Sequence, residues 1–203
     1  MPPARPVVYV VFHSMWGHVK ALAHAEVKGL QEAGVDVKLF RFPETLSSDV
    51  LSVMHASVDE SIPEITVDDL AKPDGFLFGF GTRYGRPCAQ FDTFWDKTGG
   101  LWAKGALAGK FVGCFTSTAS QHGGQETTIM SALSNFVHHG MVFVPLGFGH
   151  PKMTNLSEVM GGSAWGASTI AAGDGSRQVS DVEKDIAMHQ GKNFGHLLTK
   201  HLS

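Results

Sequence analysis

The chain has 203 residues, of which 43% are hydrophobic and 17% charged, and its formal net charge is −3. This length suits one α/β domain, and the composition excludes a disordered tail or a coiled coil. The weak negative charge gives no electrostatic reason to expect nucleic-acid binding, which needs a basic stripe. The 24 glycines indicate tight loops that approach a ligand closely.

The two cysteines, Cys88 and Cys114, have no CxxC spacing and do not make a disulfide framework. We expect both to be buried, reduced thiols of a cytoplasmic protein. The short apolar run before His13 is typical of a strand rather than of a signal sequence. No apolar run approaches the roughly 20 residues that a membrane span needs, so we expect no span.

Apolar runs and helical periodicities alternate along the chain. Residues 7–12 predict a strand buried on both faces, and the apolar face over residues 19–30 predicts a helix that Gly34 ends. The further elements that we predict are a more exposed strand at 35–42, short helices around 46–54 and 67–71, a strand at 75–80, a helix at 90–98, a strand at 111–115, a helix at 125–139 ended by Gly140, a strand at 141–145, and a helix at 181–200 with Ser180 as its N-cap. This alternation predicts a parallel, doubly wound α/β sheet in a single domain over residues 1–203.

Two segments show no helix or strand pattern. Residues 98–109 are Gly-rich, and we interpret them as an ordered loop. Residues 146–178 form a long insertion rich in Gly and Ser, and loops of this length are usually functional or disordered. Its buried-type residues Phe148, Leu156 and Trp165 favour order.

Three loops follow predicted strands, and ligands of such sheets bind beyond the carboxyl ends of the strands. Their sequences are HSMWGHV after the first strand, GTRYGRP after the third and TSTASQHGG after the fourth. All three are rich in Gly, Ser or Thr together with aromatic or His residues. Because these strand ends meet at one edge of the sheet, we expect the loops to converge on one cleft.

Each loop offers a different kind of contact. Ser14 and Gly17 lie at a helix start, where free backbone N–H groups attract a phosphate. Arg83 can hydrogen-bond an electron-rich ring or a phosphate, and Tyr84 can lie against a planar ligand. The third loop supplies hydroxyl and amide groups. Taken singly, the loops are equally compatible with a capped turn, a solvated surface turn and an ordinary connection.

The sequence lacks the motifs that are typical of several other chemistries. The sequence lacks GxxxxGK[ST], GxGxxG, GxSxG and HExxH, which argues against nucleotide cleavage, Rossmann-type binding, serine hydrolysis and a zinc site. His138 and His139 are typical of a helix C-terminus. Tryptophans are core residues by default, but Trp16 and Trp102 lie beside glycines in loops and are candidate ligand contacts.

These motifs resemble one family. SMWGHV resembles the phosphate loop SMYGH of WrbA-type NAD(P)H:quinone oxidoreductases, and GTRYG resembles their PTRFG or PTRYG. Further blocks similar to theirs are DKTGGLWAKGALAGK, TSTASQHGGQETT, HHGM and GDGSRQ-x-S. The blocks occur in order over nearly the whole chain, which is far more specific than any single loop.

The resemblance implies a flavodoxin-like fold with a five-stranded parallel sheet in the order 2-1-3-4-5. It also implies FMN as cofactor, NADH or NADPH as electron donor, a quinone as acceptor, and a homotetramer, with a homodimer as the alternative. The expected reaction is a two-electron, ping-pong reduction of quinones to hydroquinones. A flavodoxin-like one-electron carrier and a non-catalytic, FMN-binding regulatory scaffold stay open as alternatives.

The matching blocks also imply roles for single residues. The residues expected to hold the FMN phosphate are Ser14, Met15, Trp16, Gly17, His18 and Val19. Those expected along the isoalloxazine and ribityl groups are Thr82, Arg83, Tyr84 and Gly85. Those expected on the other side of the flavin are Ser117, Thr118, Ala119, Ser120, Gln121, His122 and Gly123.

Two further positions complete the expected site. His138 matches a family histidine near the flavin ring edge, and His138 and Arg83 are the catalytic candidates. Trp102 matches a tryptophan that lines the substrate pocket near a subunit boundary, and Trp16 takes the place of a tyrosine beside the nicotinamide. The chain departs from the family pattern at His13, Gly81 and Arg86, where many members have Tyr, Pro and Asn. These departures leave the nicotinamide preference and the choice of quinone open.

Overall fold

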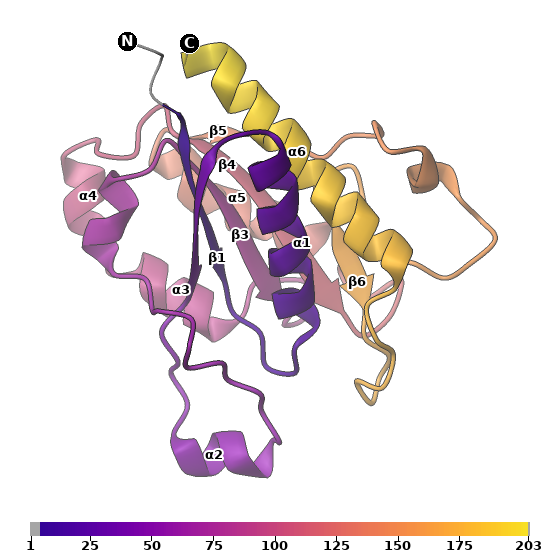
Figure 1. The fold of residues 1–203 in the computed structure, drawn as a ribbon. Coiled ribbons are helices and arrows are strands. Elements are labelled where there is room, and N and C mark those ends of the chain that lie inside the picture. Colours follow the sequence, from indigo (N-terminus) through magenta and orange to yellow (C-terminus); the bar gives the residue numbers. More distant parts are fainter. Residues whose placement is uncertain (1–4, 203) are drawn as a thin grey trace.

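A computed structural model describes residues 5–202 and has one parallel sheet at its centre (Figure 1). The strands are β1 (Val7–Phe12), β2 (Asp36–Arg41), β3 (Gly75–Gly81), β4 (Phe111–Thr118), β5 (Val142–Phe143) and β6 (Ser168–Ile170). Their order is β2-β1-β3-β4-β5, and β6 also pairs with β4. The predicted order 2-1-3-4-5 is therefore confirmed, with a sixth strand added.

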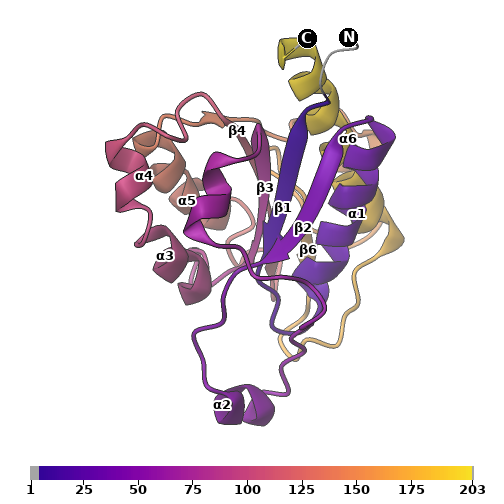
Figure 2. The same ribbon diagram turned by 60° about the vertical axis from the view of Figure 1, so that its left-hand side comes forward.

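Helices cover both faces of this sheet (Figures 1 and 2). The helices α1 (His18–Glu32) and α6 (Asp181–Leu202) pack together on one face, and α3 (Ala89–Trp95), α4 (Gly99–Ala103) and α5 (Thr127–His138) lie on the other. Gly34 and Gly140 follow α1 and α5 with φ of 79° and 71°, as the predicted helix ends require. Ser180 caps α6, because its Oγ accepts a hydrogen bond from the Glu183 N–H at 3.2 Å.

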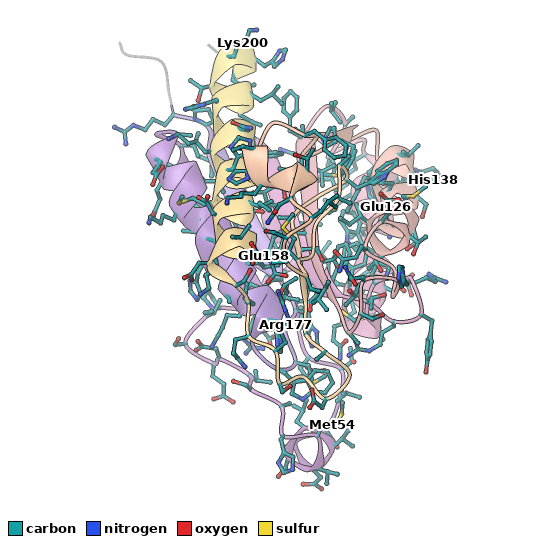
Figure 3. All side chains as sticks on the ribbon, turned by 90° about the vertical axis from the view of Figure 1, so that its right-hand side faces the viewer. Met54, Glu126, His138, Glu158, Arg177 and Lys200 are labelled. Atoms are coloured by element: carbon teal, nitrogen blue, oxygen red, sulfur yellow. The ribbon has the colours of Figure 1, made fainter. Side chains whose placement is uncertain are left out.

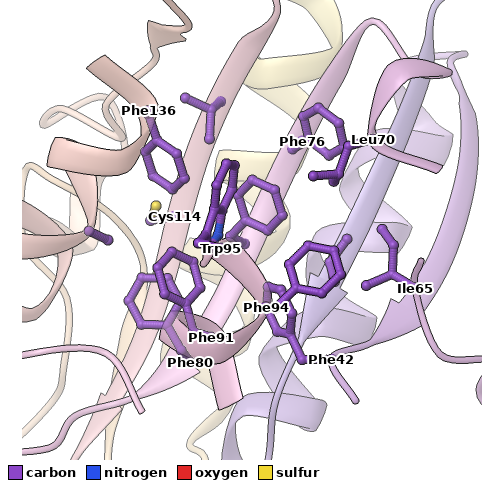
Figure 4. Packing of buried hydrophobic residues seen from close by; sticks show 14 of the residues in the cluster. Phe42, Ile65, Leu70, Phe76, Phe80, Phe91, Phe94, Trp95, Cys114 and Phe136 are labelled. Carbon is purple, nitrogen blue, oxygen red and sulfur yellow. The ribbon is translucent and has the colours of Figure 1, made fainter. Parts of the chain in front are cut away.

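Two hydrophobic cores lie between the sheet and these helices. On the α3–α5 side an aromatic cluster, which includes Phe80, Phe91, Trp95 and Phe136, fills the interior (Figure 4). Such rings prefer edge-to-face contacts, and the rings of Trp95 and Phe136 meet at 69° with centroids 5.3 Å apart. Both cysteines, Cys88 and Cys114, are free and buried on this side.

The two segments that were predicted without helices or strands contain short elements. Residues 98–109 contain α4, whose opening glycines weaken the helix signal in the sequence. Residues 146–178 contain the 3₁₀ helix η2 (Pro151–Thr154) and β6. The strand predicted at 141–145 is only β5. The N–H groups of Val142 and Val144 donate to the carbonyls of Lys110 and Val112, but the next carbonyl of β4, that of Cys114, accepts from the Gln190 side chain at 2.9 Å instead. The chain then returns as β6 beside the carboxyl end of β4, with Thr116 opposite Ser168.

One helix of the described chain, α2 (Ser48–Val53), stands away from the sheet. Between β2 and β3 the chain forms α2 and the 3₁₀ helix η1 (Val67–Ala71). Helix α2 buries none of its residues against the rest of the described chain and projects beyond the carboxyl ends of the strands (Figures 1 and 2). Within residues 5–202, none of the helices has the combination of length and apolar character needed to cross a membrane.

Candidate functional site

A cavity of about 490 Å³ lies at the carboxyl ends of β1, β3 and β4. Its volume falls within the roughly 300–1,000 Å³ of small-molecule sites. The three predicted loops form much of its wall, and residues 54–55 and 171–175 complete it. The expected convergence of the three loops is therefore observed.

The structure brings only part of the predicted set into this cavity. The predicted residues that line it are Ser14, Met15, Trp16, His18, Val19, Thr82, Arg83, Ser117, Thr118 and Ala119. The predicted residues outside its lining, as residues 5–202 form it, are Gly17, Tyr84, Gly85, Trp102, Ser120, Gln121, His122, Gly123 and His138.

The first loop builds an anion-binding geometry at the start of α1. Gly17 has a φ of 90° and is the N-cap residue, and its N–H donates to Ser14 Oγ at 3.1 Å. The next three N–H groups, those of residues 18–20, precede the first helical hydrogen bond, which runs from the Ala21 N–H to the Gly17 carbonyl at 2.9 Å, and they carry the positive end of the helix dipole. This end of the cavity fits a phosphate.

The second loop is held by Thr82. Its Oγ1 accepts hydrogen bonds from the Gly85 N–H at 3.1 Å and from Thr128 Oγ1 at 2.7 Å. The guanidinium of Arg83 donates from Nη1 to the Thr82 carbonyl at 2.8 Å and stays exposed. Tyr84 has a left-handed φ of 55°, and its side chain is fully exposed to solvent. Arg83 lines the cavity, whereas Tyr84 is outside its lining in the described chain.

Sequence reasoning missed a buried chain of hydrogen bonds in the cavity wall. His13 lies with Nε2 2.9 Å from Glu44 Oε2 and Nδ1 3.6 Å from Cys88 Sγ. Burial lowers the pKa of His13 below its usual value, although the contact with Glu44 opposes this effect. Burial also raises the pKa of the Cys88 thiol. A neutral His13 that donates from Nε2 and accepts the thiol proton at Nδ1 satisfies all three groups.

Glu44 supplies the negative charge in this group of hydrogen-bonded side chains. Burial alone would raise the pKa of Glu44, but hydrogen bonds from His13, Gln90 and the backbone N–H groups of Leu46 and Thr45 lower it to about 2. The Glu44 carboxylate therefore connects His13 of the first loop, the residues just before α2, and Gln90 of α3. The only signal of this arrangement in the sequence was that His13 departs from the family pattern.

Residues 171–175 are a second missed part of the site. The Ala171 N–H donates to the Thr118 carbonyl at 2.8 Å, which sets this loop beside the end of β4. Ala172 has a φ of 66°, a left-handed conformation that non-glycine residues rarely adopt. The sequence signal for this loop was the block GDGSRQ, which the resemblance identified without assigning it a role.

The two predicted tryptophans have different positions. Trp16 lines the cavity, is 50% exposed, and donates from Nε1 to the Met54 carbonyl at 2.9 Å, which ties the α2 segment to the first loop. Trp102 lies on α4 and is 58% exposed. His138 ends the 12-residue α5, about 16 Å along the helix axis from its first residue. Figure 3 shows His138 at the upper right of the molecule and the cavity residue Met54 at its lower end.

Comparisons with known proteins agree with this geometry. The sequence model of the NADPH-dependent FMN reductase family matches residues 14–152. The chain is 51% identical to the P25 protein of Schizosaccharomyces pombe over 92% of this chain and 94% of that protein. It is 50% identical to the NAD(P)H quinone oxidoreductase PST1 of Candida albicans over 94% of this chain and 96% of that protein.

Among solved structures, a WrbA-like flavodoxin of Agrobacterium tumefaciens superposes with a TM-score of 0.65 at 22% identity, covering 97% of this chain and 99% of that one. This likeness shows the flavodoxin-like fold. The family match spans more than half of the chain, and the sequence relatives match along nearly all of it. The chain therefore belongs to the NADPH-dependent FMN reductase family, together with the NAD(P)H quinone oxidoreductases that its motifs resemble.

Proposed function

We propose that this protein is an FMN-dependent NAD(P)H:quinone oxidoreductase that reduces quinones to hydroquinones by two electrons. The observation that carries the proposal is the cavity at the strand ends, whose wall includes the N-terminus of α1 and the aromatic side chain of Trp16. The name of the relative at 50% identity, an NAD(P)H quinone oxidoreductase, supports it.

The residues present fit FMN. The phosphate would lie against residues 14–19, where Gly17 permits the tight turn and α1 supplies free N–H groups. The flavin and ribityl groups would lie between residues 82–85 and 117–123, with contacts from those members that face the cavity. The chemistry that FMN supplies when bound is acceptance of a hydride from NADH or NADPH and transfer of two electrons to a quinone.

The side chains around the cavity position flat ligands and stabilise charge. The half-exposed ring of Trp16 offers a surface on which a nicotinamide or a quinone would stack. The Arg83 guanidinium would stabilise negative charge that develops on a bound ring. We propose that the two substrates occupy the same place in turn, which predicts ping-pong kinetics.

We further propose that the working unit is a homotetramer, with a homodimer as the smaller alternative. Within one chain neither Trp102 nor His138 lines the cavity that residues 5–202 form. Both are exposed, and exposed apolar side chains nearby in the sequence include Val137 and Val142. In this proposal Trp102 and His138 act at the flavin of a partner subunit, with His138 as a catalytic candidate beside Arg83.

Two other expectations remain proposals. We propose a cytoplasmic location, which the two free, buried cysteines support. We also propose that residues 1–203 fold as a single domain, since one sheet contains all the named strands of the described chain.

A spectroscopic assay tests the proposed activity. Purified protein loaded with FMN is mixed with NADH or NADPH, then with benzoquinone, while the flavin absorbance is followed. We expect the nicotinamide to bleach the flavin and the quinone to restore it, with parallel double-reciprocal lines in the steady state. Intersecting lines would contradict the shared site.

The same assay separates the alternatives. Reduction only by a one-electron donor would indicate a flavodoxin-like carrier. FMN binding without reduction by any of these donors would indicate a regulatory scaffold, and failure to take up FMN would overturn the whole proposal.

A further inference from the structure

The insertion and the start of α6 meet at one buried carboxylate, that of Glu183 in the first turn of α6. Its Oε1 accepts hydrogen bonds from the N–H groups of Gly161 at 2.8 Å and Ile170 at 3.4 Å. Its Oε2 accepts from Thr169 Oγ1 at 2.8 Å and from the Ser180 N–H at 2.9 Å. Glu183 therefore connects the segment before β6, β6 itself and the start of α6.

Arg177 supplies the opposite charge. Its Nη1 lies 3.0 Å from both carboxylate oxygens of Glu183 and 2.7 Å from the Ile170 carbonyl. Its Nη2 donates to the Val159 carbonyl at 2.9 Å. Burial would raise the pKa of Glu183, but the hydrogen bonds from Arg177 and the other donors lower it, so the pair is ionic. Removal of Arg177 would leave the charge of the fully buried Glu183 uncompensated, whereas Arg177 is itself partly exposed.

The backbone of Arg177 joins this pair to the cavity. Its carbonyl lies 2.8 Å from His18 Nε2, in the first residue of α1, and its N–H donates to the Ala171 carbonyl at 3.1 Å. The bond to Ala171 closes a loop, and residues 171–175 of this loop line the cavity and include the left-handed Ala172. Figure 3 shows Arg177 beside the N-terminal ends of α1 and α6.

Strained backbone of this kind persists only where the surroundings hold it in place. The hydrogen bonds of Arg177 to Glu183 and to the Ile170 carbonyl hold the loop at its end near α6. The Thr118 carbonyl, which accepts from the Ala171 N–H, holds the loop at its end near β4. His18 in turn contributes both a wall of the cavity and the first N–H group of α1. Displacement of loop 171–177 would therefore also release His18 at the phosphate end.

We propose that the Arg177–Glu183 ion pair is a positioning device that holds loop 171–177 and His18 around the phosphate end of the bound flavin. It thereby favours FMN over riboflavin, which has the same ring and ribityl chain without the phosphate. The inference rests on the proposed FMN site. Neither Arg177 nor Glu183 lines the cavity of the described chain, so both act through the residues that they position.

Flavin titration of the full-length protein, after reversible removal of its flavin, tests this role. The dissociation constants of FMN and riboflavin are measured for wild type, Glu183→Gln and Arg177→Lys. Groups that orient a binding residue from behind are worth about 10- to 100-fold in affinity at metal sites. We expect Glu183→Gln to weaken FMN binding about tenfold and riboflavin binding much less, and Arg177→Lys, which keeps the charge, to have a smaller effect of the same kind.

Glu26→Gln is the matched control. Glu26 is equally buried on α1, but it does not line the cavity of the described chain. We expect this variant to bind both flavins as wild type does. The ratio of the two affinities is the decisive measurement, because a merely structural loss would weaken FMN and riboflavin alike.

Each outcome decides the question. Unchanged FMN affinity in Glu183→Gln, or equal weakening of both flavins, overturns the positioning role. If Glu183→Gln does not fold, Arg177→Lys decides, and a wild-type FMN:riboflavin ratio in that variant overturns the inference. Wild-type protein that binds no FMN would instead overturn the proposed function, so the two failures are distinct.

Discussion

At the residue scale, backbone conformation shapes the phosphate end of the cavity. Gly17 has a φ of 90° at the N-cap of α1, in the left-handed region where a side chain on Cβ is disfavoured. Only with this conformation does the chain turn from β1 into α1 while Ser14 Oγ accepts the Gly17 N–H. A glycine is therefore needed here for its backbone, although a Cβ at Gly17 would meet no atom of the described chain within 4 Å.

Gly17→Ala is expected to weaken FMN binding, because relief of the strain shifts the N–H groups at the start of α1. Gly34→Ala is a matched control, since Gly34 has a φ of 79° and equally open space but lies at the other end of the helix. We expect both variants to lose about 1–2 kcal/mol of unfolding free energy. Flavin titration should show weakened FMN binding only for Gly17→Ala, and equal FMN affinities would contradict this assignment.

Glu44 gives a second prediction at this scale. Hydrogen bonds from His13, Gln90 and two backbone N–H groups outweigh burial and lower its pKa from 4.5 to about 2. A carboxyl whose pKa is lower in the folded state stabilises the protein above its unfolded pKa, and this stabilisation is lost as the pH falls through the folded pKa. Urea unfolding should therefore show wild type to be more stable than Glu44→Gln near neutral pH. The difference should shrink between about pH 4.5 and 2, and a pH-independent difference would argue against the charge of Glu44 as its source.

At the scale of elements, the closest packing is between α1 and α6. Cβ atoms added at Gly29 and Gly191 would lie 1.9 Å from the Met188 carbonyl oxygen and 2.3 Å from the Glu26 carbonyl oxygen. The two helices can therefore approach this closely only at glycine. Glu26 is fully buried at this crossing, and within residues 5–202 its carboxyl oxygens make no well-formed hydrogen bond, although the Gly191 backbone N–H nearby opposes the effect of burial on its pKa. The crossing thus combines tight packing with an unpaired acid.

Glu26→Gln is expected to stabilise the protein increasingly as the pH rises. Burial raises the pKa of Glu26 well above its ordinary value of 4.5, so the folded protein retains a proton that the unfolded chain releases. Wild-type stability is therefore penalised above about pH 4.5, by up to about 1.4 kcal/mol per pH unit, until the pH reaches the folded pKa. Denaturant unfolding across pH checks this. A stability gap between the two proteins that narrows as the pH rises would contradict it.

At the scale of the whole molecule, the described chain exposes several large apolar side chains. They include Trp102 on α4, Val137 on α5, Phe148 after β5, and Leu156 in the insertion, which is 97% exposed. Single exposed apolar side chains are common on soluble proteins, whereas a contiguous apolar patch is typical of an interaction surface. In the proposed association of several copies, we expect these side chains to lie in the contacts between subunits.

Trp102→Ala is expected to leave FMN bound while the kcat/KM for benzoquinone falls about tenfold, a loss within the range of an aromatic interface residue. Val53→Ala is the control, because Val53 is 81% exposed on α2 and was not assigned to the site. Flavin absorbance, quinone turnover and native mass are measured for both variants. Loss of the bound FMN from Trp102→Ala, or unchanged turnover at unchanged mass, would contradict the proposed place of Trp102.

The sequence by itself determined the main sheet, the large helices and the three loops that meet at the cavity. These features depend on local patterns, such as the apolar runs of β1 and β3 and the periodicity of α1, which each segment carries within itself. The strand order was predicted from the family that the motifs resemble, and the observed order of the strands in the sheet confirmed it.

Only the tertiary structure decided the division of the last sheet position between β5 and β6, the contact of His13 with Glu44 and Cys88, and the place of loop 171–175. The partners in these features lie far apart in the chain, as with His18 and Arg177 at 159 positions or His13 and Cys88 at 75. Short segments such as β6 have too few residues to show a period, so their pairing depends on the strand already beside them. Their conformation is set by distant contacts, which a local pattern does not encode.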